Sequence, residues 1–97
     1  FDPETVSLIE GANIQLNKIY PNPARAITVI PISSNREQKL RIQLMNLQGQ
    51  IVNEIYNGKI YAGDKNFFID ASKYPSGVYQ VHIQSEEYEQ FQKLVID

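Results

Sequence analysis

Apolar and polar residues alternate with a period of two along Lys39–Leu47, which is the pattern of a strand with one buried face. Leu40, Ile42 and Leu44 fall on one side of this segment, whereas Lys39, Arg41 and Gln43 fall on the other. Such alternation is typical of antiparallel sheets that pack one face on a core and leave the other face in water. The segment is therefore predicted to be a half-buried antiparallel strand.

A second stretch, Val78–Ser85, alternates even more strictly and predicts another strand of the same kind. Its predicted inward residues are Tyr79, Val81 and Ile83, and its predicted outward residues are Gln80, His82 and Gln84.

Five further segments have the composition of strands, and turn signals separate them. They are Ile14–Tyr20, Ala26–Ile32, Ile51–Ile60, Lys65–Ser72 and Phe91–Asp97. Clusters of Gly, Pro, Asn and Ser recur roughly every 8–12 residues, which is the spacing expected for a β-sandwich. The sequence thus predicts an all-β domain, a sandwich of about seven antiparallel strands. Pro31 lies inside one of these segments and cannot donate a ladder hydrogen bond, so that segment is predicted to be an edge strand or to contain a bulge.

Composition agrees with the strands and excludes several classes of function. Six Tyr and four Phe, with many Ile and Val, suit a pleated surface. A net charge of −2, with both signs scattered, argues against nucleic-acid binding, which needs a basic face. No apolar run approaches the roughly 20 residues that cross a bilayer, and no signal peptide opens the chain. The absence of cysteine excludes disulfides and thiolate chemistry.

The candidate catalytic and metal-binding groups have plainer explanations. His82 is the only histidine and is predicted to be a solvated surface residue among glutamines. Glu86, Glu87 and Glu89 form the densest acidic cluster, but they occupy a predicted hairpin tip without the glycine and spacing of a calcium loop. We therefore predict no enzyme activity, no metal site and no cofactor.

The aromatic residues alternate with aliphatic ones at strand spacing, which favours packing in the core over a sugar-binding platform. Tyr79, Phe67 and Phe91 are predicted to be core residues. Tyr56, Tyr61 and Tyr88 are left as the candidates for an exposed platform.

Four segments, taken together and in order, resemble one known family. They are IYPNPA (Ile19–Ala24), IQLMNLQGQIV (Ile42–Val52), YPSGVYQVHI (Tyr74–Ile83) and FQKLVID (Phe91–Asp97). Their order and spacing resemble the C-terminal sorting domain of type IX secretion cargo proteins of Bacteroidetes, over about residues 19–97. Each motif is weak alone, whereas all four in register are specific.

The resemblance implies an immunoglobulin-like sandwich without catalytic activity, spanning residues 14–97, that directs an exported parent protein through the outer membrane. The implied partners are the outer-membrane translocon, its shuttle or receptor proteins, and a surface sortase-like protease that in most members removes the domain and attaches the cargo to the cell surface. No membrane insertion is implied. Because the chain opens on Phe1 rather than Met, it is expected to be a segment of a longer protein, with residues 1–13 as a linker or loose leading strand.

The family motifs map onto individual residues of this chain. The matching positions are Pro21, Asn22, Pro23, Gly49, Gly77, Tyr79, Lys93, Leu94 and Val95. Two positions depart from the pattern: Gln50 stands where a basic residue is usual, and the chain ends on Asp97 rather than on a basic residue.

The residues themselves suggest what these positions do. Gly49 and Gly77 fall where a turn can require a positive φ, and an inward Tyr79 needs a partner for its hydroxyl group. If the terminal strand lies at a sheet edge, its free backbone groups could pair with a strand of a receptor. The alternatives left open are an accessory module that binds carbohydrate or a surface protein, and a structural spacer.

Overall fold

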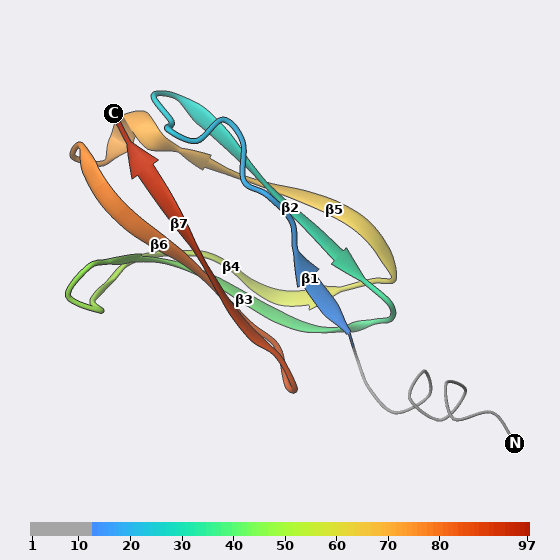
Figure 1. The fold of residues 1–97 in the computed structure, drawn as a ribbon. Coiled ribbons are helices and arrows are strands. Elements are labelled where there is room, and N and C mark those ends of the chain that lie inside the picture. The colour runs from blue at the N-terminus through green and yellow to red at the C-terminus, as the bar shows by residue number, and fades with distance from the viewer. Residues whose placement is uncertain (1–12) are drawn as a thin grey trace, which may run out of the picture.

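Two antiparallel sheets packed face to face make up the part of the chain that the computed structural model describes, residues 13–97 (Figure 1). The three-stranded sheet has the order β1 (Ile14–Leu16), β2 (Ile27–Ser34), β5 (Gly63–Asp70). The four-stranded sheet has the order β4 (Ile51–Ile60), β3 (Gln38–Asn46), β6 (Gly77–Gln84), β7 (Glu89–Ile96). The predicted all-β sandwich is confirmed. The expectation for residues 1–12 lies outside the described part of the chain.

The core lies between the sheets and is built from the inward positions of the alternating strands. Leu40, Ile42 and Leu44 of β3 are at most 1% exposed, as are Val81 and Ile83 of β6. Burying such a side chain stabilises the fold by about 1.5–3 kcal/mol. The inward residues that the alternation predicted for these two strands are therefore confirmed.

Pro31 does not mark an edge strand, because β2 is the central strand of its sheet. The carbonyl oxygen of Pro31 accepts a hydrogen bond from the Asn17 N–H at 2.9 Å, just beyond the end of β1. In an antiparallel strand the nitrogen and oxygen of one residue point to the same side, so the missing N–H faces Asn17 and not β5. The ladder between β2 and β5 therefore continues through Pro31, which pairs with Asn66.

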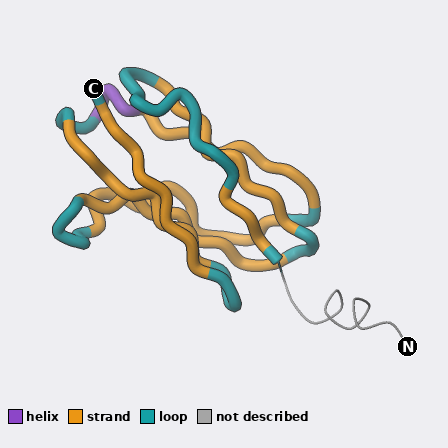
Figure 2. Tube along the Cα trace, in the orientation of Figure 1, coloured by secondary structure: helices purple, strands orange, loops and turns teal. Residues whose placement is uncertain are grey.

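A short 3-10 helix, η1 (Ala71–Lys73), ends β5 earlier than the sequence predicted (Figure 2). The Asp70 carboxylate accepts hydrogen bonds from the Ser72 hydroxyl group at 2.6 Å and from the Ser72 N–H at 3.1 Å. These bonds, with the hydroxyl contact as the largest cause, lower the pKa of Asp70 below its usual value. Residues 71–73 thus turn the chain toward β6 instead of continuing β5.

None of the helical residues in the described range, 13–97, forms a helix that is long and apolar enough to span a membrane.

Candidate functional site at the terminal edge

The last strand, β7, is the edge strand of the four-stranded sheet and pairs with β6 along its whole length. The outer side of β7 faces residues 17–24, which we call the arm. Together, the outer side of β7 and the arm form what we call the terminal edge. This arrangement brings the opening motif and the closing motif of the sequence into contact.

Asn22 joins the arm to β7 through both atoms of its side-chain amide. The Asn22 Nδ2 donates to the Lys93 carbonyl oxygen at 2.8 Å, and Oδ1 accepts from the Val95 N–H at 3.0 Å. The carboxamide thus makes the two bonds that the N–H and C=O of one residue in a parallel neighbouring strand would make, and the Ala24–Ile96 bridge beside it is parallel. The two residues of the Asn22–Lys93 pair are 71 positions apart in the sequence.

Ala24 continues this contact with its backbone. The Ala24 N–H donates to the Val95 carbonyl oxygen at 2.8 Å, and the Asp97 N–H donates to the Ala24 carbonyl oxygen at 2.9 Å. The side chain of Ala24 is fully buried. The outer backbone groups at this end of β7 are therefore occupied, and the expectation that they are free to pair with a receptor strand is wrong.

The prolines on either side of Asn22 explain why the arm contacts β7 through a side chain. Neither Pro21 nor Pro23 has an N–H, so neither can donate to a ladder along β7. The peptide bonds before both prolines are cis, and both rings are exposed. The buried hydroxyl group of Thr28 donates to the Pro21 carbonyl oxygen at 2.7 Å, which anchors the arm on β2.

The three residues of the closing motif have different surroundings. Leu94 is fully buried in the core, whereas Lys93 is exposed and Val95 is half-buried. Leu94 therefore contributes to folding. Of the three, Lys93 has the side chain most accessible to a partner.

The remaining motif residues lie at the same end of the sandwich. Tyr79 of β6 pairs with Leu94 on one side and with Asn46 on the other, and Gly77 pairs with Ile96. Gly49 lies in the turn that follows Asn46. The ladder register thus gathers the four motifs at one end of the domain, where the chain also ends (Figure 1).

Gly49 and Gly77 both have positive φ, as expected. At Gly49 φ is 82°, a backbone conformation that residues other than glycine rarely adopt. The Asn46 side chain supports this turn, because its Oδ1 accepts from the N–H groups of Gln48 and Gln50 at 3.0 Å. Gly77 begins β6 with φ of 157°. Both glycines therefore have a structural role.

Tyr79 is directed inward and is only 7% exposed, as predicted. Its hydroxyl group donates to the Pro75 carbonyl oxygen at 2.6 Å, four residues upstream. This contact is similar to the tyrosine corner of immunoglobulin-like sandwiches, in which a tyrosine hydroxyl bonds to the backbone a few residues earlier.

Replacing Tyr79 with phenylalanine is expected to lower the free energy of unfolding by about 1–2 kcal/mol, because the Pro75 carbonyl loses its partner. Denaturation in urea measures this difference. Tyr61→Phe is the matched control, since Tyr61 is 67% exposed. Equal effects of the two substitutions would show that the Tyr79 hydroxyl bond contributes nothing.

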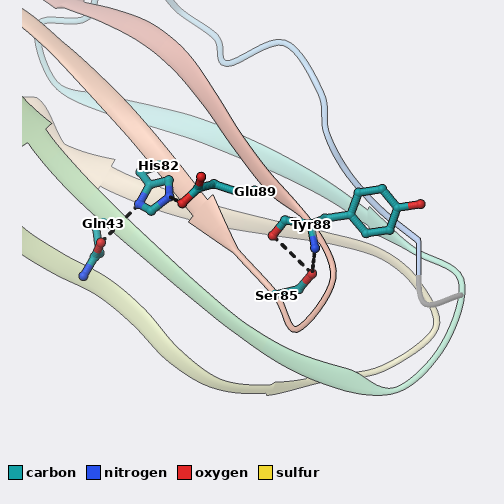
Figure 3. A network of polar contacts seen from close by, with 5 residues as sticks. All are labelled: Gln43, His82, Ser85, Tyr88 and Glu89. Atoms are coloured by element: carbon teal, nitrogen blue, oxygen red, sulfur yellow. Dashed lines mark hydrogen bonds and ion pairs between the residues drawn. The ribbon is translucent and has the colours of Figure 1, made fainter.

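His82 is not the solvated residue that its outward position suggested. It does point away from the core, but side chains of the neighbouring strands cover it and leave it 7% exposed. The Phe91 ring stacks on it at 4.4 Å between ring centroids. The Glu89 Oε2 lies 2.8 Å from Nε2 and the Gln43 Oε1 lies 3.2 Å from Nδ1 (Figure 3). Within residues 13–97, no cluster of three or more His, Asp or Glu residues could hold a metal ion.

Phe91 is not a core residue, because it shares the outer face with His82, to which it is directly opposed. It is 50% exposed, whereas Phe67 is 8% exposed and belongs to the core as predicted. The predicted hairpin next to it is confirmed, since the Ser85 N–H donates to the Tyr88 carbonyl oxygen at 2.8 Å and Glu86 lies in the turn between them. Contrary to the prediction, Glu89 is not at the tip but is the first residue of β7 and pairs with Gln84.

Of the three tyrosines considered for a platform, Tyr56 and Tyr61 line one depression, and Tyr88 does not. Tyr56 packs on Phe67 with the ring centroids 4.7 Å apart, and its hydroxyl group donates to the Lys59 carbonyl oxygen. Tyr61 lies between β4 and β5, and Tyr88 lies between β6 and β7. The geometry therefore does not bring together the three tyrosines of the carbohydrate-binding alternative.

Comparison with known protein families gives a match over most of the chain. Residues 18–97 match the family described as the secretion system C-terminal sorting domain. The chain belongs to this family. The segments predicted to be its opening and closing motifs lie inside the matched range and meet at the terminal edge.

A solved structure supports the fold. The crystal structure of dimeric latent PorU from Porphyromonas gingivalis contains a similar sandwich, with a TM-score of 0.67 and 18% sequence identity. The match covers 91% of this chain but only 10% of that one. Among curated proteins, no sequence matches this chain.

The two departures from the family pattern have other contacts in this chain. The Gln50 Oε1 accepts from the Asn46 Nδ2 at 2.8 Å, so this residue supports the turn around Gly49. The Asp97 Oδ2 lies 3.6 Å from the Arg25 Nε, in an exposed ion pair between the last residue and the residue that follows the arm. Exposed pairs of this kind contribute little stability, typically below about 1 kcal/mol.

Proposed function

We propose that this domain directs an exported parent protein across the outer membrane by the type IX secretion system, and that the exposed side of the terminal edge is the surface that the secretion machinery recognises. The observation that carries the proposal is the direct bonding of Asn22 to Lys93 and Val95, which makes one surface from the first and last family motifs. Membership in the sorting-domain family supports the transport role.

Recognition at this surface depends on side chains. The backbone of β7 is already paired from Lys93 to Asp97, so a receptor strand would first have to displace the arm. The exposed side chains on this surface include those of Lys18, Tyr20, Pro21, Pro23 and Lys93, and Arg25 directly follows the arm. They combine rigid proline rings, one aromatic ring and three cations, which suits docking onto a preformed acidic or aromatic receptor surface.

The partners in this proposal are the outer-membrane translocon and its shuttle or receptor proteins. A surface sortase-like protease would then remove the domain and attach the cargo to the cell surface. The domain would pass through the periplasm in the folded state, and it would act as a ligand without catalytic activity of its own.

The test fuses the 97-residue chain to a periplasmic reporter in a bacterium with a type IX system and measures reporter at the cell surface. The wild-type fusion is expected to reach the surface, and Lys93→Glu is expected to reduce delivery several-fold. Because Lys93 is exposed, the substitution should leave the melting temperature within a few degrees of wild type.

Lys65→Glu is the matched control, because Lys65 is an exposed residue of β5 on the other sheet. A folded wild-type fusion that stays in the periplasm would overturn the sorting function. Normal delivery of the Lys93→Glu fusion would leave that function standing and would place recognition elsewhere.

A further inference from the structure

The edge strands β1 and β7 belong to different sheets and lie beside each other. Side chains join them, and these side chains are at positions that the family motifs do not include. Gln90 and Gln92 are on β7, and their side chains reach across to the other sheet and to the arm. Both are half-buried. No continuous backbone ladder joins these edges, since β1 pairs with β2 and β7 pairs with β6.

Gln90 uses its amide as a bridge to β1. Its Nε2 donates to the Ile14 carbonyl oxygen at 3.1 Å, and its Oε1 accepts from the Leu16 N–H at 2.9 Å. These are the outward backbone groups of β1, which would otherwise form an open sheet edge.

Gln92 makes the same pair of contacts with the beginning of the arm. Its Nε2 donates to the Asn17 carbonyl oxygen at 2.9 Å, and its Oε1 accepts from the Ile19 N–H at 2.7 Å. Ile19 is fully buried, so this contact holds the arm at the point where it enters the core. Asn22 repeats the arrangement farther along, with the carboxamide on the arm and the backbone groups on β7.

We propose that Gln90 and Gln92 are positioning residues of the sorting signal, which hold the arm in register against β7 so that the opening and closing motifs form one surface. The proposal rests on the proposed function, because it assigns these side chains to the surface that the secretion machinery recognises. It adds a requirement that no motif states: a carboxamide, with one donor and one acceptor, at both positions.

The chemistry of the contacts shows why glutamate cannot replace glutamine. An ionised carboxylate has no donor, so it would leave the Asn17 carbonyl without a partner and place a second oxygen against it. A protonated carboxyl group has one donor and one acceptor, and it can restore both bonds. The effect of Gln92→Glu should therefore depend on pH, with the variant weakest when the introduced carboxyl group is ionised.

The experiment compares wild type, Gln92→Glu and the control Gln48→Glu, which adds the same charge at an exposed turn position. At pH 7 we expect Gln92→Glu to lower the melting temperature by roughly 10 °C. We expect it also to speed hydrogen exchange at the Ile19 N–H about tenfold and to reduce surface delivery of the fused reporter several-fold. Near pH 3.5, below the usual carboxyl pKa of about 4.3, the difference in melting temperature should shrink to less than half.

A second variant keeps the test decisive if Gln92→Glu does not fold. Gln92→Met has a side chain of similar shape without either hydrogen-bonding group, and it should show a smaller loss of delivery with no pH dependence. Normal exchange at Ile19 and normal delivery in both variants would overturn the proposal, as would a loss of melting temperature in Gln92→Glu that does not change with pH. Failure of the wild-type fusion to reach the surface would instead overturn the sorting function itself.

Discussion

Deletion of residues 93–97 is expected to unfold the domain. Leu94 is fully buried and Ile96 is 2% exposed, and both pack in the core between the sheets. Removing the side chain of one buried leucine or isoleucine typically costs about 2–5 kcal/mol, whereas a domain of this size has only about 5–15 kcal/mol of stability. The deletion removes two such side chains together with the ladder partners of Gly77 and Tyr79.

The same deletion also leaves polar groups of the arm without their hydrogen-bond partners. The Asn22 carboxamide loses both of its partners, and the Ala24 N–H and carbonyl groups lose theirs. We therefore expect the truncated chain to lose its cooperative thermal transition and the dispersed amide signals of a folded β-domain in NMR spectra. Lys93→Glu in the full chain is the control, since it changes the motif without removing a buried side chain.

The truncation experiment bears directly on how a sorting signal is identified. A parent protein that loses export after such a deletion has lost a folded domain, so the result does not identify the residues that a receptor contacts. A truncated chain that still melts cooperatively near the wild-type temperature would show that the last five residues are dispensable for folding. Loss of export would then be evidence for recognition by the chain end itself.

The alternation in the sequence was sufficient to predict β3 and β6, because the apolar residues of each strand fall on the face that packs in the core. The turn positions of Gly49 and Gly77 were also predictable, since a positive φ favours glycine. These features depend on a few neighbouring residues. Local patterns of this kind are what a single sequence records most clearly.

The closure of the terminal edge could not be predicted in this way. Asn22, Gln90 and Gln92 bond to backbone groups more than 70 positions away, and such contacts have no period in the sequence. A glutamine whose side chain bonds to the backbone of another strand cannot be distinguished in the sequence from a glutamine that is exposed to solvent. Only the register between the arm and β7 distinguishes the two.

His82 and Phe91 show a related limit. Alternation tells which side of a strand a residue occupies, but burial also depends on the residues beside it in the sheet. His82 has Phe91 opposite it on β7 and Gln43 opposite it on β3, and these neighbours shield it on the outer face. The prediction of a solvated histidine and a core phenylalanine was wrong because the pairing of the strands was unknown.

The adjacent phenylalanines of β5 give the sharpest test of how strand register decides burial. Phe67 and Phe68 are identical in chemistry and next to each other in sequence, but their side chains point to opposite faces of the sheet. Phe67 is 8% exposed and packs on Tyr56, whereas Phe68 is 57% exposed on the outer face, opposite Val29 of β2. Because both residues are phenylalanine, a hydropathy scale gives the two positions the same hydrophobicity and cannot tell which of them is buried.

Phe67→Ala is therefore expected to lower the free energy of unfolding by about 3–5 kcal/mol, because it leaves a cavity between the sheets. Phe68→Ala should change it by no more than about 0.5 kcal/mol. Urea denaturation of the two variants measures the difference, and the midpoint for Phe67→Ala should fall far below that of its neighbour. Equal losses would mean that β5 has a different register. Since a shift by one residue exchanges the inner and outer faces of a strand, the pairing of β5 with β2 would then be wrong along its whole length.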